Sequence, residues 1–166
     1  MLEKILVVEP DKCVACRNCE LACSFKHGGE FNPMRSRIRS FNYPVTPFPI
    51  SITCLQCEDA VCEGICPTWA IFRDLATGAI VIDKERCEGC EMCMQVCPFG
   101  NIRLDPLEDV AIKCDLCGGD PECVKFCITG ALQYVEAKDS VRFWWRDFVE
   151  KVQTNKENLL VAKERL

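Results

Sequence analysis

The stretch Cys87-Glu-Gly-Cys90-Glu-Met-Cys93-Met-Gln-Val-Cys97-Pro98 decides the fold, because its cysteine spacing of two, two and three residues recurs along the chain. All 16 cysteines fall into four such groups, of which the second and fourth have a longer gap before the third cysteine. The groups are Cys13, Cys16, Cys19 and Cys23; Cys54, Cys57, Cys62 and Cys66; Cys87, Cys90, Cys93 and Cys97; and Cys114, Cys117, Cys123 and Cys127. Runs of this kind hold [4Fe–4S] clusters, so four groups predict four clusters.

The fourth cysteine of each group predicts how the groups cooperate. Three thiolates on one tight loop reach three irons, whereas the fourth cysteine lies about one helical turn further on and faces another way. In two-cluster ferredoxins this fourth cysteine ligates the other cluster of the pair. Pro67 and Pro98 complete the usual Cys-Pro ending in the two inner groups, while Ser24 and Ile128 stand at that position in the outer two.

Other uses of cysteine fit this pattern poorly. Disulfide frameworks belong to oxidising compartments, and the first ten residues contain acids rather than an apolar leader. Zinc sites favour paired Cys-x2-Cys knuckles, often with histidine, and no group begins with the Cys-x4-Cys spacing of plant-type two-iron sites. No apolar run approaches the roughly 20 residues that span a bilayer. We therefore expect a cytoplasmic protein without a transmembrane segment.

Charge and length bound the function further. The chain has 166 residues and a formal net charge of -5. Thiolate ligands and cluster cores together are expected to bring the loaded protein to roughly -13, which argues against nucleic-acid binding because such proteins show a basic face. Only about forty residues serve each cluster, and segments that short rarely fold by apolar burial alone. We therefore expect the chain without iron to be largely unfolded.

Apolar runs between turn signals predict short strands around the cysteine groups. Residues 3–8 form a strand that leads into the first group, and residues 131–135 close the set. Residues 70–82, with a glycine turn, and residues 102–112, with an Asp-Pro turn, each predict a hairpin. Short helices are expected between the third and fourth cysteines and just beyond. The predicted fold class is α+β, with tandem ferredoxin-like units around four clusters and a C-terminal helical tail.

The groups can pair sequentially or in a nested order. The 20 residues between Cys66 and Cys87 suit a single hairpin, whereas 30 residues separate Cys23 from Cys54. The inner groups also share the proline ending, so we favour the nested order, with the fourth cysteines exchanged. Its ligand sets are Cys13, Cys16, Cys19 and Cys127 (site 1); Cys54, Cys57, Cys62 and Cys97 (site 2); Cys87, Cys90, Cys93 and Cys66 (site 3); and Cys114, Cys117, Cys123 and Cys23 (site 4).

The nested order predicts a double ferredoxin-like domain at residues 1–137 and a helical extension at residues 138–166. Within the domain, the inner unit is expected at about residues 50–105 and the outer unit at residues 1–49 plus 106–137. The extension has apolar residues at helical spacing, among them Trp144, Trp145 and Phe148. We interpret this stripe either as packing on the domain or as docking on another chain, including a second copy.

The chain resembles the four-cluster ferredoxin-type subunits that serve dimethyl sulfoxide reductase-class enzymes, formate dehydrogenases, hydrogenases and carbon monoxide dehydrogenases. The resemblance covers residues 1–136 and rests on the cysteine runs and on three further motifs. These are Pro-Phe-Pro-Ile-x3-Cys-Leu-Gln-Cys-Glu-Asp-Ala (47–60), Cys-Pro-Phe-Gly-Asn-Ile (97–102) and Lys-Cys-Asp-Leu-Cys-Gly-Gly (113–119). The resemblance implies nested pairing and a non-catalytic subunit that carries single electrons through four [4Fe–4S] clusters.

Residues 19–38 carry a narrower resemblance. The run Cys-Glu-Leu-Ala-Cys-Ser-Phe-Lys-His-Gly-Gly-Glu-Phe-Asn-Pro-Met-Arg-Ser-Arg-Ile is similar to the small iron–sulfur subunits of tungsten-dependent aldehyde oxidoreductase complexes. This implies a tungstopterin-containing catalytic partner and, as second redox partner, a flavin subunit or a ferredoxin. The alternative is the same role for a carbon monoxide dehydrogenase, hydrogenase, formate dehydrogenase or molybdenum oxidoreductase. The family usually has Cys-Pro where this chain has Cys127-Ile128, which bears on the polarity around one cluster.

A few other residues are candidates for a role. His27, the only histidine, is interpreted as a structural residue that bonds loop backbone, with a partner contact or a proton role as the alternative. Arg35, Arg37 and Arg39 recur at period two on an expected strand. They are candidates for partner docking, for raising the potential of a nearby cluster, or for a solvated strand face.

No residue is expected to make or break bonds in a substrate. Sixteen cysteines for four cubane clusters leave no iron open, as a radical enzyme would require. The alternative of another class is a structural or filament-forming iron–sulfur scaffold, although four clusters exceed what folding alone requires.

Overall fold

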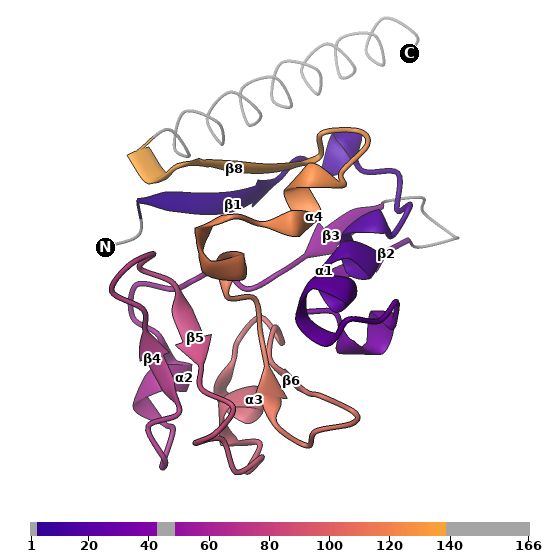
Figure 1. The fold of residues 1–166 in the computed structure, drawn as a ribbon. Coiled ribbons are helices and arrows are strands. Elements are labelled where there is room, and N and C mark those ends of the chain that lie inside the picture. Colours follow the sequence, from indigo (N-terminus) through magenta and orange to yellow (C-terminus); the bar gives the residue numbers. More distant parts are fainter. Residues whose placement is uncertain (1–2, 43–48, 139–166) are drawn as a thin grey trace, which may run out of the picture.

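The computed structural model describes residues 3–42 and 49–138, in which short strands alternate with short helices (Figure 1). The strands are β1 (Lys4–Val8), β2 (Arg39–Phe41), β3 (Ile50–Ile52), β4 (Ile71–Arg73), β5 (Ile80–Ile82), β6 (Arg103–Leu104), β7 (Ala111–Ile112) and β8 (Leu132–Glu136). The α-helices are α1 (Asn18–Gly28), α2 (Val61–Gly64), α3 (Met92–Val96) and α4 (Glu122–Lys125), and the 3-10 helices are η1 (Pro10–Lys12), η2 (Pro33–Arg35) and η3 (Leu116–Gly119). This is the small α+β fold expected for a ferredoxin-like protein.

The β1–β8 sheet joins the two ends of the described chain. Its antiparallel register pairs Lys4 with Glu136 and Val8 with Leu132. A bond from Glu9 N to Ala131 O, at 2.7 Å, extends the pairing toward the cysteine loops. Because the first cysteine group follows β1 and the last precedes β8, this sheet holds the two outer groups next to one another.

The two predicted hairpins, β4–β5 and β6–β7, lie at the other end of the molecule (Figure 1). In the first turn, the Asp74 carboxylate accepts hydrogen bonds from Thr77 N at 3.1 Å and from Thr77 Oγ1 at 2.6 Å. Gly78 completes that turn in the left-handed region, with φ 72°. In the second turn, Asp105 N donates to Val110 O at 2.8 Å. Both hairpins are therefore confirmed, with the turn residues on which the prediction depended.

Each α-helix carries the third cysteine of one group, as the motif spacing predicts. Helix α1 packs against α4, and α2 packs against α3. Helix α1 is longer than the other three because it continues past Cys23 to Gly28, where Gly29 caps it in the left-handed region with φ 69°. The helix contacts bring the outer groups together and the inner groups together, which supports the nested order.

Residues 33–41 differ from the expected strand. Proline is favoured at the first position of a helix, and Pro33 begins η2, so β2 starts only at Arg39. The expectation that Arg35, Arg37 and Arg39 share one strand face is therefore wrong. Strand β2 instead pairs with β3, with Arg39 opposite Ile52, and this pairing was not predicted from the sequence.

The predicted extension at residues 138–166 lies almost entirely outside the described residues, as do Trp144, Trp145 and Phe148. The unit bounds stay a prediction. Strand β3 ends at Ile52 and strand β7 ends at Ile112. Unit boundaries placed near these two residues would therefore not divide any of the described strand pairs. Among the described helices, none is both long and apolar enough to cross a membrane.

Candidate metal centres

The four cysteine groups share one backbone conformation. In every group the residue before the second cysteine is left-handed: Ala15 (φ 52°), Gln56 (φ 53°), Gly89 (φ 67°) and Leu116 (φ 56°). Three of these residues carry a side chain, for which the left-handed region costs roughly 1–2 kcal/mol. Left-handed residues next to right-handed ones turn successive N–H groups to one side and form an anion-binding concavity that recurs at iron–sulfur sites. The sequence repeat is therefore also a structural repeat.

Gly89 is the position in this repeat where no side chain fits. A Cβ atom there would lie 2.2 Å from Asp109 O, in the turn of the β6–β7 hairpin. The same hairpin reaches the sulfur of the loop, since Ala111 N donates to Cys87 Sγ at 3.3 Å. The third cysteine loop and the β6–β7 hairpin thus form one packed unit.

Backbone N–H groups are directed at a cysteine sulfur in each predicted site. Such bonds favour the negatively charged form of the sulfur, which is the form that binds metal. Besides Ala111 N, the donors are Leu132 N to Cys127 Sγ at 3.4 Å, Gln56 N to Cys54 Sγ at 3.5 Å and Arg37 N to Cys23 Sγ at 3.3 Å. These donors, together with sets of free thiols, fit clusters with thiolate ligands.

Two cavities are each lined by four cysteines. One is lined by Cys13, Cys16, Cys19 and Cys127, and the other by Cys54, Cys57, Cys62 and Cys97. In both cavities the fourth cysteine comes from a group distant in the sequence. These are the sets predicted for sites 1 and 2, so the cavities support the nested pairing over the sequential one.

The sulfurs predicted for site 4 also lie close enough to affect one another. The pKa of Cys123 is raised, first by burial and then by the nearby sulfurs of Cys114, Cys23 and Cys117. Cys19 of site 1 has a weaker effect of the same sign on Cys123. The three strongest sulfur neighbours of Cys123 are therefore its predicted co-ligands.

Three of the four site 3 cysteines, Cys66, Cys87 and Cys93, pack with Ile71 and Ile80 in one apolar core, which also contains two cysteines of site 2. Burial, then the nearby sulfurs of Cys87 and Cys90, raises the pKa of Cys93 to about 11. At Cys66 burial also acts to raise the pKa, but hydrogen bonds from Thr68 and from backbone N–H groups outweigh it and lower the pKa. Because iron binds the thiolate, the raised pKa of Cys93 opposes iron binding and the lowered pKa of Cys66 favours it.

Comparison with known proteins agrees with this geometry. Residues 46–137 match the family model of the 4Fe-4S dicluster domain. The chain belongs to this family. The chain is 42% identical to the aliphatic sulfonate oxidoreductase polyferredoxin-like subunit of Pyrococcus furiosus, over 74% of this chain and 70% of that one. An uncharacterized ferredoxin of Methanocaldococcus jannaschii is 38% identical, over 96% of this chain and 100% of that one.

A third relative is the thiosulfate reductase electron transfer subunit of Salmonella typhi, which is 32% identical over 82% of this chain and 77% of that one. The chain is thus a ferredoxin-like protein that binds [4Fe–4S] clusters and transfers electrons. Ferredoxin-like proteins of this type are electron-transfer subunits of oxidoreductase complexes. Cluster binding and the electron-transfer class, both predicted from the cysteine pattern, are confirmed.

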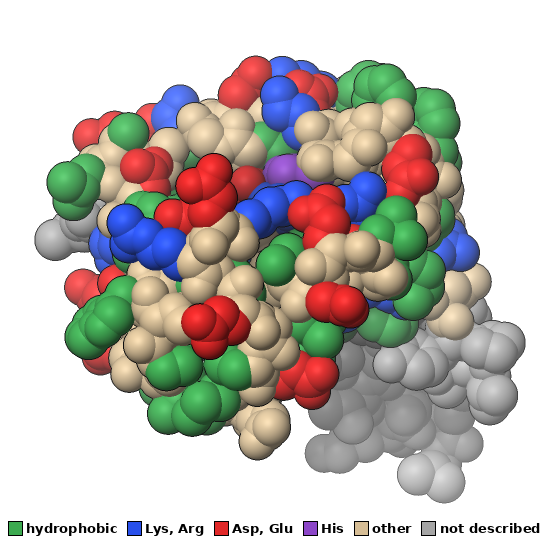
Figure 2. All heavy atoms as spheres, turned by 60° about the horizontal axis from the view of Figure 1, so that its bottom comes forward, with side chains coloured by type: hydrophobic (Ala, Val, Ile, Leu, Met, Phe, Trp, Pro, Cys, Tyr) green, Lys and Arg blue, Asp and Glu red, His purple; other side chains and the backbone are tan. Residues whose placement is uncertain are grey.

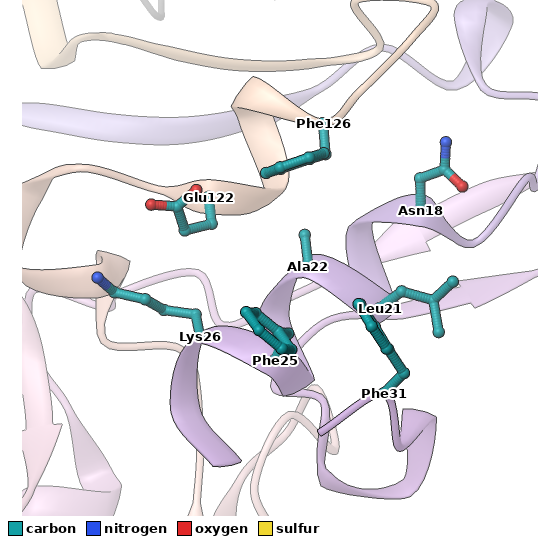
Figure 3. A pocket seen from close by; sticks show the side chains of 8 residues that line it. All are labelled: Asn18, Leu21, Ala22, Phe25, Lys26, Phe31, Glu122 and Phe126. Carbon is teal, nitrogen blue, oxygen red and sulfur yellow. The ribbon is translucent and has the colours of Figure 1, made fainter. Parts of the chain in front are cut away.

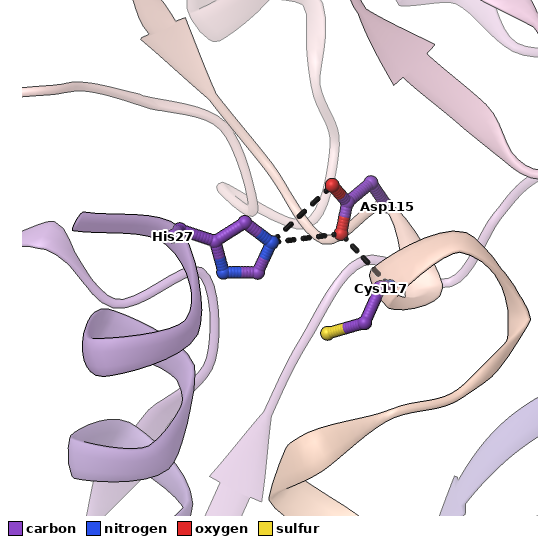
Figure 4. Close-up of side chains that lie close together, drawn as sticks. All are labelled: His27, Asp115 and Cys117. Carbon is purple, nitrogen blue, oxygen red and sulfur yellow. Dashed lines mark hydrogen bonds and ion pairs between the residues drawn. The ribbon is translucent and has the colours of Figure 1, made fainter. Parts of the chain in front are cut away.

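His27 connects two elements that carry site 4 cysteines (Figure 4). Its Nδ1 lies 2.8 Å from Cys23 O in α1, and its Nε2 lies 3.1 Å from Asp115 Oδ1. Asp115 also accepts hydrogen bonds from Cys117 N at 2.9 Å and from Arg37 Nη1. Burial opposes both charged forms, but these bonds outweigh it, so the pKa of His27 is raised and that of Asp115 is lowered. His27 thus has structural contacts, but the backbone that it bonds belongs to its own helix α1 and not to a loop as expected.

The substitution Asp115→Asn is expected to lower the unfolding free energy of the loaded protein by roughly 2–4 kcal/mol. Arg37 and His27 would lose their carboxylate partner although their side chains are only 12% and 15% exposed. The depressed pKa of Asp115 means that its stabilisation is present above its ordinary value of 3.8 and is lost as the pH falls below it. Denaturant unfolding at several pH values measures both effects, and the variant should lose this acid-dependent component.

Asp120→Asn is the matched control, because that side chain is 74% exposed and pairs with Lys125 at the surface. Exposed ion pairs contribute little to stability. Equal destabilisation by the two substitutions would contradict the role given to Asp115.

Basic side chains gather in a band across one face of the molecule, with acidic side chains around them (Figure 2). Arg35 bonds Asp105 at 2.9 Å and is 10% exposed, and Arg37 is bound to Asp115. The interpretation of these two as a solvated strand face is wrong, because their charges are paired inside the chain. Arg39, whose Nε lies 3.8 Å from Glu20, keeps 33% of its side chain exposed. Partner docking through these arginines stays a prediction, with Arg39 as the accessible member.

An open apolar cavity of about 650 Å³ lies between α1 and α4 (Figure 3). Its wall includes the stacked rings of Phe25 and Phe31, whose centroids are 4.9 Å apart, and the ring of Phe126. No cysteine lines it, so it is separate from the cluster cavities although both helices carry cysteines. These residues could not be singled out from the sequence, because Phe25 and Phe126 lie close to cysteines that dominate the local pattern and Phe31 is a lone aromatic residue in a loop.

Proposed function

We propose that this protein is the electron-wiring subunit of an oxidoreductase complex, with four clusters in the order site 1, site 4, site 2, site 3. A bound [4Fe–4S] cluster supplies a one-electron couple whose potential depends on hydrogen bonds, nearby charge and solvent exposure. One observation carries the proposal: each of three groups of packed side chains joins cysteines of two neighbouring sites. The sites then form a single unbranched row.

The packed groups support this order of the sites. They join Cys19 with Cys23 and Cys123 (sites 1 and 4), Cys114 with Cys54 (sites 4 and 2), and Cys62 with Cys87 and Cys93 (sites 2 and 3). Leu116, with 0% exposure, lies at the junction of sites 4 and 2, and Ile80, with 1%, lies in the group of sites 2 and 3. Such residues keep water away from the path between neighbouring sites.

The two ends of the row reach the surface. Cys16 of site 1 and Cys90 of site 3 are exposed, whereas every cysteine of sites 2 and 4 is buried or partly buried. Val14, next to Cys16 in the first loop, is 59% exposed. Electrons would therefore enter and leave at sites 1 and 3, one from the catalytic subunit and one to the second redox partner, while the two middle sites stay covered.

The catalytic partner that we propose is a tungsten-dependent aldehyde oxidoreductase subunit, which the motif at residues 19–38 supports. The 42% identity to the polyferredoxin-like subunit of an aliphatic sulfonate oxidoreductase favours a second candidate, a sulfonate oxidoreductase. In both cases the proposed acceptor is a flavin subunit or a ferredoxin.

The proposal is tested on the tagged protein, purified anaerobically from its native host together with whatever subunit it retains. We expect about 16 irons per chain and a co-purifying subunit that contains tungsten. Addition of an aldehyde should reduce the clusters, as followed by EPR spectroscopy. Reduction by an aliphatic sulfonate instead would select the second candidate. Clusters that no substrate of the complex reduces would contradict electron wiring and favour the scaffold.

A further inference from the structure

Lys113 is a buried ammonium group without a carboxylate partner. The residue is 2% exposed, and its Nζ donates to two backbone carbonyls, Ile80 O and Cys114 O, the latter at 2.9 Å. Across residues 3–42 and 49–138, no Asp or Glu forms an ion pair with it. A buried charge is costly unless an opposite charge compensates it, so the neighbours of Lys113 must include another source of negative charge.

The sulfurs of two different sites are that source. Lys113 lines the cavity formed by the four site 2 cysteines, whose wall is otherwise mainly apolar. Lys113 also reaches the neighbouring site, because its Nζ bonds the carbonyl oxygen of Cys114, a site 4 cysteine, at 2.9 Å. Sites 2 and 4 are neighbours in the proposed row, so Lys113 lies at its centre.

A closed set of hydrogen bonds holds the ammonium group in place. Gln56, which is 4% exposed, donates from Nε2 to Cys114 O at 2.7 Å and accepts from Ile80 N at 2.9 Å. Lys113 donates to the same Cys114 carbonyl and to the carbonyl of Ile80, whose N–H binds Gln56. Gln56 sits in the site 2 loop and Cys114 in the site 4 loop. The bonds therefore tie both loops and β5 around a fixed positive charge.

We propose that Lys113 is the shared counter-charge of sites 2 and 4, and that it raises the reduction potentials of these two central clusters. The inference rests on the wiring function proposed above. Reduction adds one negative charge to a cluster, and a fixed positive charge in a poorly solvated interior stabilises the reduced form more than the oxidised form. Nearby charge is among the factors that set cluster potentials. Lys113 thus makes the two covered sites easier to reduce, so that electrons cross between the inner and outer cysteine groups.

The test replaces the charge and leaves the hydrogen bonding as intact as the chain permits. Lys113→Gln keeps a donor but removes the charge, and Lys113→Arg keeps the charge. Lys125→Gln is the matched control, because it removes the charge of another lysine in the fourth cysteine group whose side chain is 45% exposed and pairs with Asp120 at the surface. The full chain of each variant is purified anaerobically, its iron is counted, and all clusters are titrated by EPR at controlled potentials.

In Lys113→Gln, two of the four midpoint potentials should fall while the other two stay unchanged. At the wild-type midpoint, we expect the reduced-to-oxidised ratio of the two affected clusters to drop at least tenfold, which corresponds to about 59 mV for one electron. Lys113→Arg should keep the wild-type potentials, and Lys125→Gln should move them far less than Lys113→Gln does. A shift in none or all of the four clusters, or an equal shift in Lys125→Gln, would overturn the proposal.

The iron content of each variant provides a second test if a variant fails to bind all its clusters. Loss of two clusters from Lys113→Gln but none from Lys113→Arg would support a counter-charge that the central sites require. Loss from both variants would show a packing role and overturn it. Wild-type protein that lacks four reducible clusters would instead refute the wiring function itself, whereas normal wild-type behaviour with unmoved variant potentials would refute only the role of Lys113.

Discussion

Removal of iron is expected to unfold the domain, with loss of most of its ordered strands and helices. Its apolar cores are small and are shared with the metal ligands. Of the 13 buried residues in the three packed groups, five are cysteines: Cys19, Cys23, Cys93, Cys114 and Cys123. The strands around them have only two to five residues. A domain with so little apolar burial needs a metal or another crosslink to fold.

The proposed ligand sets explain why the effect should be large. Site 1 would connect Cys13 with Cys127, and site 4 would connect Cys23 with Cys114, so iron closes the longest loops of the chain. Loss of those crosslinks gives the unfolded chain back its conformational entropy. Metal-site binding energy then appears directly as folding energy. The β1–β8 sheet alone, two strands of five residues, cannot replace it.

Far-UV circular dichroism and amide hydrogen exchange measure this effect on the anaerobic protein before and after chelation. We expect protection of the β1–β8 amides to disappear with the iron and to return when iron and sulfide are restored under reducing conditions. The reconstituted sample is the control for irreversible damage. Persistence of native protection in the iron-free chain would show that apolar burial suffices and would contradict the prediction.

Local signals account for the parts of the fold that could be predicted. The β4–β5 turn depends on Asp74 and Gly78, which bond and bend the chain within five residues of sequence. The cysteine spacing also goes with one loop conformation. Ala15, Gln56, Gly89 and Leu116 each precede the second cysteine of a group, and all four are left-handed. Where the deciding interaction lies inside one motif, pattern and structure agree.

The missed features depend on contacts between distant segments. Arg35 pairs with Asp105, 70 residues away, and Arg37 pairs with Asp115, 78 residues away. No local pattern distinguishes such residues from a solvated basic strand. The same holds for Lys113. In the sequence it is one charged residue before a cysteine, and only the fold brings Ile80 and Gln56 next to it. The β2–β3 pairing was missed because its strands are only three residues long.

Cys127→Ala and Cys16→Ala are expected to remove the same cluster, although 110 residues lie between these cysteines. Both line one cavity with Cys13 and Cys19. Each single variant should therefore keep about three intact [4Fe–4S] clusters, and the double variant should also keep about three, because a cluster missing one ligand is already lost or converted. Iron, sulfide and the EPR spin count of the anaerobic protein measure the number of intact clusters.

The combination of Cys127→Ala with Cys90→Ala is the matched comparison. Cys16 and Cys90 are both exposed and both stand second in their group, so each substitution removes little packing. In the nested order these two cysteines serve different sites, and the double variant should keep about two intact clusters. Sequential pairing predicts the reverse, because Cys127 would then complete the cluster of Cys87, Cys90 and Cys93. If the Cys127→Ala/Cys16→Ala variant loses two clusters and the Cys127→Ala/Cys90→Ala variant loses only one, the four sites form two separate pairs instead of a single row.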